Sequence, residues 1–146
     1  MTTSPPFSFP RYLAAKKSVD DRALNRLVWR RLAEEIAARN SALAVLEIGA
    51  GIGTMYERIV EWGLLKGGRY TALDSEAENV AAARPRLGNG VGDLPLTIEQ
   101  ADVFEFAARP DQQQRYDLLI AHAVLDLFDI PRALPRLLAV LKPDGL

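Results

Sequence analysis

The chain has 146 residues, of which 49% are hydrophobic and 25% are charged, and these values are typical of one soluble globular domain. It contains no cysteine and one histidine, which excludes disulfides, cysteine nucleophiles and metal sites built from thiolates or several histidines. Its 18 basic and 19 acidic residues nearly cancel, so the chain as a whole is no obvious polyanion binder. No apolar run reaches membrane-spanning length and no secretion signal is recognisable, which predicts a cytoplasmic protein without membrane contact.

Residues 1–40 are predicted to form a flexible lead-in followed by an N-terminal helical cap. The prolines of the first ten residues predict that the lead-in runs to Pro10. Asp20 and Asp21 offer an N-cap for a helix that ends near Asn40. Its apolar residues recur at helical spacing: Leu24, Leu27, Val28, Leu32 and Ile36. This part holds eight basic and four acidic residues, an excess that fits either a cap meeting an anionic ligand or a solvated helix face.

Residues 41–146 alternate between short apolar runs and helical patterns. The apolar runs predict strands at 42–48, 69–73, 96–100 and 116–121. The helical patterns lie at 54–65, 75–87, 103–108 and 131–141, and Ser75 is the expected cap of the second of these helices. Residues 88–93 are predicted to be a loop. This alternation predicts an α/β fold with a parallel sheet and right-handed crossovers.

A glycine-rich turn follows the first predicted strand, in the sequence Glu47-Ile48-Gly49-Ala50-Gly51-Ile52-Gly53. Its glycines permit a tight turn and a close approach of a ligand to the backbone, and the following helix offers free N–H groups. A Walker phosphate loop would need a lysine after the last glycine, where Thr54 stands. A dinucleotide loop would need the pattern Gly-x-Gly-x-x-Gly. Counted from Gly49 or from Gly51, the position of its third glycine falls on Thr54 or on Tyr56. The spacing therefore argues against a nicotinamide-dependent oxidoreductase.

The turn resembles motif I of the class I S-adenosylmethionine-dependent methyltransferases, and further motifs of that family follow in order. Asp74 ends the second predicted strand and Asp102-Val103 follows the third. Residues 116–121 resemble the fourth-strand motif, and residues 138–145 resemble the family's leucine-lysine-proline-glycine-glycine turn, with Asp144 in place of the first glycine. The resemblance covers about residues 42–146. It implies a Rossmann-like, three-layer αβα domain at residues 41–146 that binds S-adenosylmethionine.

The resemblance also implies a role for each of these residues. Gly49, Gly51 and Gly53 would cradle the cofactor, and Glu47 would hold its amino end. Asp74, with Ser75 beside it, would accept hydrogen bonds from the ribose hydroxyls. Asp102 would bind the adenine amine, and Val103 would pack on the adenine ring. Purely structural roles remain possible for three of these residues. Asp74 and Asp102 can each be a plain helix cap, and Glu47 can be a charge at the end of a strand.

His122, the only histidine, lies just past the fourth predicted strand. It is the candidate general base, since its ordinary pKa is near neutral, or alternatively it forms part of the cofactor wall. In the family, segments before the core often cover the active site, so Tyr12, Lys16, Arg22 and Asn25 are further candidates. Arg22 would suit a carboxylate through its planar guanidinium.

The expected reaction is methyl transfer by in-line displacement, with S-adenosylhomocysteine as product and no metal. A small-molecule acceptor is preferred because residues 121–124 lack the Asn/Asp-Pro-Pro-aromatic motif of nucleic-acid methyltransferases. RNA remains a less favoured acceptor because of the basic first part. The alternative is a non-catalytic or truncated module that binds the cofactor or a protein partner without turnover.

The family's sheet has seven strands, whereas the motifs of this chain stop after the fourth. The expectation is therefore that strands five to seven of the family are missing. Residues 116–121 are apolar on both faces, as in an interior strand, and an open edge there would favour aggregation. A dimer partner or a further C-terminal segment is accordingly expected to cover this edge.

Overall fold

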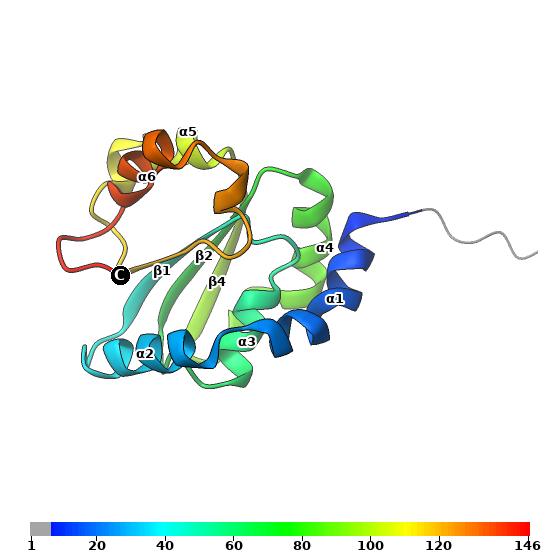
Figure 1. The fold of residues 1–146 in the computed structure, drawn as a ribbon, viewed down its shortest axis with the longest axis horizontal. Helices are drawn as coiled ribbons and strands as arrows, with labels where there is room; N and C mark the ends of the chain where they lie inside the picture. Colours follow the sequence, from blue (N-terminus) through cyan, green and yellow to red (C-terminus); the bar gives the residue numbers. More distant parts are fainter. Residues whose placement is uncertain (1–6) are drawn as a thin grey trace, which may run out of the picture.

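The computed structural model describes residues 7–146, which form one five-stranded sheet with helices on both faces (Figure 1). The strands are β1 (Leu43–Ile48), β2 (Gly68–Asp74), β3 (Gly90–Val91), β4 (Leu94–Gln100) and β5 (Leu118–Ile120). Their order in the sheet is β3-β4-β2-β1-β5, and every pairing except that of β3 with β4 is parallel. The expected Rossmann-like α/β fold is thereby confirmed.

Six α-helices surround the sheet: α1 (Phe9–Ala23), α2 (Arg26–Ala37), α3 (Thr54–Glu61), α4 (Ala77–Leu87), α5 (Val103–Ala107) and α6 (Ile130–Leu138). Figure 1 shows α5 and α6 on one face of the sheet and α2 and α3 on the other. Strand β1 is buried along its whole length because its side chains alternate between two cores. Leu43 and Val45 pack with the α3 side chains, and Ala44 and Leu46 pack with those of α5 and α6.

The N-terminal part differs from the prediction, since one expected helix is two. The predicted lead-in falls partly on residues 1–6, which lie outside the described residues. Helix α1 begins at Phe9, whereas the predicted helix began after Asp20 and Asp21. Pro10 fits the first helical turn, where no intrahelical N–H bond is lost. Asp20 and Asp21 lie near the end of α1 and therefore cap no helix start. Asn25 takes that role for α2 by accepting hydrogen bonds from the next backbone N–H groups.

The predicted loop at 88–93 contains a strand, because Gly90–Val91 turns back on β4 as an antiparallel hairpin. The Tyr56 hydroxyl fixes this hairpin by donating to the Leu94 carbonyl at 2.7 Å and accepting from the Val91 N–H at 2.8 Å. A fully parallel sheet was therefore the wrong expectation at this edge. The hairpin was not predicted from the sequence, because glycines at these positions are more typical of a turn or loop than of a strand.

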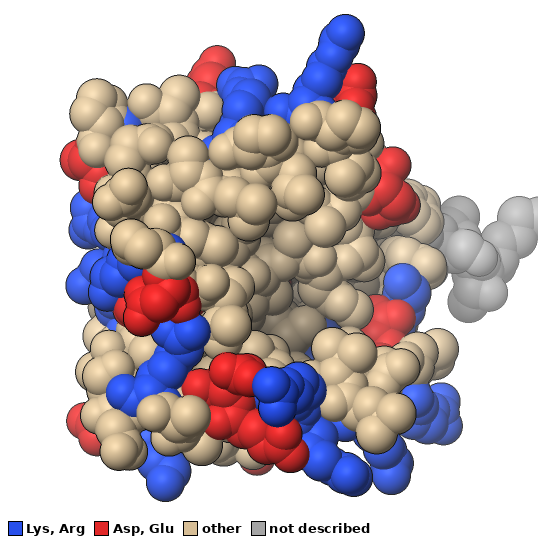
Figure 2. All heavy atoms as spheres, turned by 60° about the vertical axis from the view of Figure 1, so that its left-hand side comes forward, with Lys and Arg blue, Asp and Glu red and all other residues tan. Residues whose placement is uncertain are grey.

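The opposite edge of the sheet is β5, which is shorter than the predicted strand at 116–121. The chain's own residues 141–146 lie along it. Tyr116 forms a parallel bridge with Leu141, and Leu146 donates to the Asp117 carbonyl at 2.9 Å and accepts from the Leu119 N–H at 2.8 Å. Figure 2 turns the side that carries the C-terminus toward the viewer. It shows a mostly uncharged upper half, while acidic and basic side chains gather across the lower half.

Among residues 7–146, none of the helices combines the length and the apolar character that crossing a membrane would require.

Candidate active site

The turn between β1 and α3 has the backbone that its glycines predict. Gly49, Gly51 and Gly53 have φ angles of 64°, 59° and 84°, in the left-handed region that other residues rarely adopt. A Cβ atom on Gly49 would lie 2.6 Å from Val124 Cγ2, and one on Gly51 would lie 3.1 Å from Leu13 Cδ1 of α1. The turn is therefore closely packed as well as specially folded, and larger residues would displace its neighbours.

Asp74 connects this turn to the next helix. One carboxylate oxygen, Oδ2, accepts a hydrogen bond from the Gly51 N–H at 2.7 Å. The other, Oδ1, accepts from the Glu76 N–H at 2.9 Å and from the Asn79 side chain at 3.2 Å. The predicted cap Ser75 makes no cap bond to α4, whose N-cap position is occupied by Glu76. Asp74 thus shapes the site through three protein hydrogen bonds. It is not the N-cap of α4, because Glu76 holds that position.

Asp102 lies between β4 and α5. Its Oδ1 caps α5 by accepting from the N–H groups of Phe104 and Glu105 at 2.8 and 3.0 Å. Its Oδ2 has no hydrogen-bond partner within residues 7–146. A carboxylate has room for several acceptor bonds, so the capping role leaves one oxygen available to a donor on a ligand.

Glu47 is a buried carboxyl group in β1. Only 3% of the residue is exposed, and the Tyr70 hydroxyl donates to its Oε2 at 2.8 Å. Burial raises the pKa of Glu47 to about 8, although the hydrogen bond from Tyr70 and the charge of Arg58 favour ionisation. The group therefore holds a proton at neutral pH, and a cation placed beside it would favour its release.

Arg58 of α3 is almost fully buried and ties α1 to the rest of the domain. Its Nε donates to Asp21 of α1, and its Nη1 donates to the Thr54 hydroxyl at 3.4 Å. Lys17 adds a second link, since its Nζ lies 3.2 Å from both Asp21 Oδ2 and Glu61 Oε2. Paired charges at this depth position α1 over the glycine turn.

One cavity of about 340 Å³ lies at the carboxyl ends of the parallel strands. Eight of the nine predicted site residues line it: Glu47, Gly49, Gly51, Asp74, Ser75, Asp102, Val103 and His122. Gly53 does not, because it occupies the N-cap position of α3 instead. The structure thus brings together residues from four segments that are far apart in the sequence, as expected at this end of a parallel α/β sheet.

The sequence analysis missed several other residues that line the cavity. Helix α1 contributes Phe9, Leu13 and Asp20, and it also contributes Lys16, which was among the N-terminal candidates. The start of α4 contributes Glu76 and Asn79, and the segment before α6 contributes Leu127 and Phe128. The four α1 residues are spaced by four, three and four positions, which is one face of a helix. That spacing is the signal that could have identified them.

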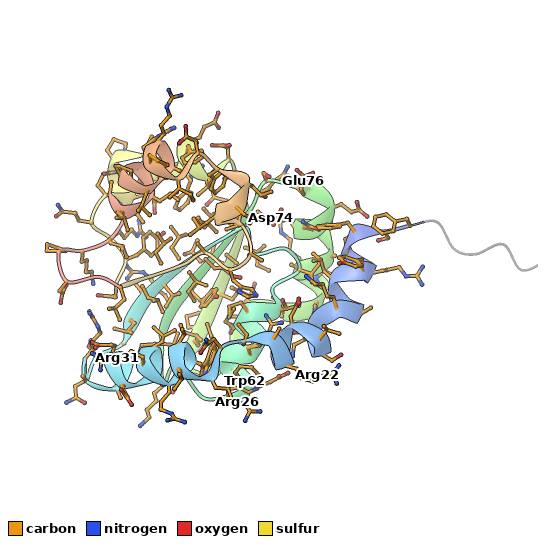
Figure 3. All side chains as sticks on the ribbon, viewed as in Figure 1. Arg22, Arg26, Arg31, Trp62, Asp74 and Glu76 are labelled. Atoms are coloured by element: carbon orange, nitrogen blue, oxygen red, sulfur yellow. The ribbon has the colours of Figure 1, made fainter. Side chains whose placement is uncertain are left out.

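The other N-terminal candidates do not reach the cavity. Arg22 is exposed at the end of α1, and Figure 3 shows it far from Asp74, which contradicts a role for Arg22 at a cofactor carboxylate. Tyr12 is also exposed and absent from the cavity wall. Asn25 caps α2.

His122 is half-buried in the cavity wall just past β5. Burial lowers its pKa, and the charge of Arg58 lowers it further, while Asp20 opposes the shift. The imidazole is therefore neutral at pH 7, the form that can accept a proton.

Comparisons with known proteins agree with this geometry. The profile of a family described as "Methyltransferase domain" matches residues 45–145. The polyketide synthase component of compactin nonaketide synthase from Penicillium citrinum is 29% identical over an alignment of 119 positions that covers 78% of this chain and 4% of that protein. The chain therefore corresponds to a small part of this curated relative.

Two solved structures share the fold. The plantazolicin methyltransferase BpumL, in complex with SAH, superposes with a TM-score of 0.59 at 23% identity, over 93% of this chain and 51% of that one. A putative S-adenosyl-L-methionine-dependent methyltransferase from Methanococcus maripaludis superposes with a TM-score of 0.62 at 18% identity, over 99% of this chain and 65% of that one. The cofactor of the family is S-adenosylmethionine. With a family match across more than half of its residues, the chain belongs to the methyltransferase domain family, of the class I S-adenosylmethionine-dependent type.

Proposed function

We propose that this chain binds S-adenosylmethionine in the cavity beside the glycine turn and transfers its methyl group to a small molecule. The proposal rests on one observation: residues at the carboxyl ends of three strands line one cavity. The glycine turn after β1, Asp74 at the end of β2 and Asp102 after β4 line the same cavity. Ligands of open α/β sheets bind at such carboxyl ends, and the glycines allow close approach to the backbone.

Three of the carboxyl groups that line the cavity differ in the hydrogen bonds that they can make to a ligand. Asp74 would accept the ribose hydroxyls on the lone pairs that its three protein donors leave free. The unbonded Oδ2 of Asp102 would accept the adenine amine, with Val103 against the ring. Glu47 would meet the ammonium group, which favours the ionised form of this carboxyl.

When bound, S-adenosylmethionine supplies a methyl group on a positively charged sulfur, and in-line displacement by an acceptor atom leaves S-adenosylhomocysteine. The residues of this chain then have to align the acceptor and exclude water. Phe9, Leu127 and Phe128 give the cavity apolar walls, which suit an acceptor with apolar surface. The neutral His122 would take a proton from the acceptor where the acceptor carries one.

Calorimetric titration of the full chain with S-adenosylhomocysteine tests the cofactor site. Asp74→Ala is expected to weaken binding by about 1.5–3 kcal/mol, the range for a hydrogen bond to a charged group. NADH is the negative control because the turn has the wrong spacing for a dinucleotide. Unchanged affinity in the variant would remove Asp74 from the ribose role, and absence of binding by the folded wild type would contradict the proposal.

Methyl transfer itself is tested by following S-adenosylhomocysteine release in the presence of small apolar acceptors that carry a hydroxyl or amine. His122→Asn should slow turnover while leaving S-adenosylhomocysteine affinity within about threefold of wild type, since proton transfer contributes to rate rather than binding. Cofactor binding without turnover on any acceptor would favour the alternative, a module that binds the cofactor only.

A further inference from the structure

Both tryptophans of the chain meet outside the cofactor cavity. Trp29 of α2 and Trp62 at the end of α3 lie edge to face, with ring centroids 4.8 Å apart. Figure 3 shows Trp62 together with Arg22 and Arg26 at the opposite end from Asp74 and Glu76. A surface hollow of about 480 Å³, here called the tryptophan hollow, is lined by Asp21, Leu24, Arg26, Trp29, Arg30 and Trp62.

The rim of the tryptophan hollow carries positive charge that the domain does not neutralise. Within residues 7–146, no carboxylate lies at ion-pair distance from Arg22, Arg26 or Arg30. Their neighbour Arg31, by contrast, lies 2.6 Å from Glu35. The one acidic residue of the lining, Asp21, is paired with Arg58 and Lys17. The hollow therefore offers its arginines to an anionic partner.

Large apolar side chains lie exposed beside these arginines. Leu27 and Val28, which follow Arg26 in α2, are 71% and 66% exposed, and Trp62 is 42% exposed. Single exposed apolar residues are ordinary, but tryptophan, arginine and aliphatic groups gathered around a concave site are the composition of protein-binding hot spots. None of these residues lines the cofactor cavity, so the proposed methyl transfer leaves the cluster unexplained.

We propose that the tryptophan hollow is a docking site for an acidic protein segment with one bulky apolar side chain. The apolar side chain would fill the space between Leu24, Trp29 and Trp62, and flanking carboxylates would pair with Arg26 and Arg30. Such pairs set orientation and association rate, while the buried aromatic contact supplies most of the affinity.

Exposed Leu27 and Val28 favour a protein over a nucleic acid, because aliphatic side chains gain little beside a phosphate backbone. The edge-to-face rings also do not form the open stacking platform that single-stranded nucleic acid needs. Since the hollow and the cofactor cavity share no lining residue, a partner can hold this domain while the active site remains open.

The experiment is a selection from a random twelve-residue peptide library displayed on phage, with the full chain immobilised. The double variant Arg26→Glu/Arg30→Glu serves for counter-selection. The matched control is Arg84→Glu/Arg132→Glu, which changes the net charge equally at exposed arginines of α4 and α6. Circular dichroism verifies that each variant is folded. Glu at the first position of α2 suits a helix start, so the double variant should fold.

The selected peptides are then titrated into the protein while tryptophan emission is followed. Both tryptophans line the hollow and a neighbouring cavity beside Ile36 and Leu43, but not the cofactor cavity. The emission signal therefore reports binding at either of the first two, and the double variant assigns it to the hollow. The expected result is an acidic consensus around one apolar residue, a change in emission on binding, and at least about tenfold weaker binding by the double variant. The control variant should stay within about twofold of wild type.

Three outcomes would overturn the proposal. The first is a selection without an acidic-apolar consensus, and the second is a consensus peptide that binds the double variant as tightly as wild type. The third is a different occupant of the hollow. A second copy of this chain would be revealed by concentration-dependent self-association that the double variant abolishes, and a nucleic acid by emission quenching with an oligouridylate. Calorimetric titration of the double variant with S-adenosylhomocysteine shows whether cofactor binding is intact, so a failure of peptide docking can be distinguished from a failure of the proposed cofactor binding.

Discussion

At the scale of single residues, the site is organised by carboxyl groups with different surroundings. Asp74 accepts three hydrogen bonds from protein groups, whereas Glu47 is buried with one. The positions of both at strand ends could be predicted from the sequence, because an acidic residue directly after an apolar run is visible there. The partners Asn79 and Tyr70 could not, since these bonds cross between segments that only the fold brings together.

Glu47→Gln should change how stability depends on pH. Between about pH 5 and 8 the native Glu47 keeps a proton that the unfolded chain releases, since its native pKa is about 8. Raising the pH therefore favours the unfolded state, by up to about 1.4 kcal/mol per pH unit. The variant cannot titrate, so its free energy of unfolding should lack this decline. Urea unfolding at several pH values measures both proteins, and parallel curves would mean that Glu47 is already ionised in the native state.

At the scale of elements, helix α1 is the main departure from the sequence prediction. The strands and helices after residue 41 follow clear periodicities, so the strand that precedes the glycine turn and the helices on both faces were predictable. Helix α1 was not, because it begins beside prolines and buries only Pro10 completely. What holds α1 is a set of charge pairs with α3, which depend on the tertiary arrangement and leave no periodic pattern.

Asp21→Asn should loosen α1. It leaves the buried guanidinium of Arg58 without its carboxylate, and unfolding should become easier by about 2–4 kcal/mol. The matched control is Asp20→Asn, whose surface pair with Lys16 contributes less than about 0.5 kcal/mol.

Urea unfolding gives the stability of both variants, and hydrogen exchange locates the change. Faster exchange is expected in α1 for Asp21→Asn. Equal effects of the two substitutions would show that the link to Arg58 does not hold α1.

In the molecule as a whole, Asp117 links β1 to the C-terminal residues at the β5 edge of the sheet. Its side chain accepts from the Ala44 N–H of β1 at 2.7 Å and from Lys142 Nζ at 2.8 Å. Its backbone carbonyl accepts from the Leu146 N–H. The sequence motifs at residues 116–121 and 138–145 predicted a strand and a turn, but not that a single aspartate would fasten them to β1. These contacts between distant segments depend on the order of the strands in the sheet, and the periodicity of the sequence does not give that order.

Asp117→Asn should therefore destabilise the whole domain, by about 1–3 kcal/mol at pH 7. Burial opposes ionisation of Asp117, but the bonds from Lys142 and Ala44 outweigh it and lower its pKa. A lowered native pKa means that the stabilisation is present above about pH 4 and is lost as the pH falls further. Thermal unfolding from pH 7 to pH 3 should show the two proteins converging at the acidic end. Asp144→Asn, at an exposed and longer ion pair with Arg39, is the control and should change little.

The shape of the glycine turn has a thermodynamic consequence for ligand binding. Backbone bonds from Ala50 to Leu73 at 2.8 Å and from Gly53 to Ala50 at 2.9 Å, together with the bond from Gly51 to Asp74, fix the turn through protein groups alone. The conformational entropy of its three glycines is consequently lost when the chain folds, not when a ligand arrives. Cofactor association should therefore show a small ordering penalty at this turn.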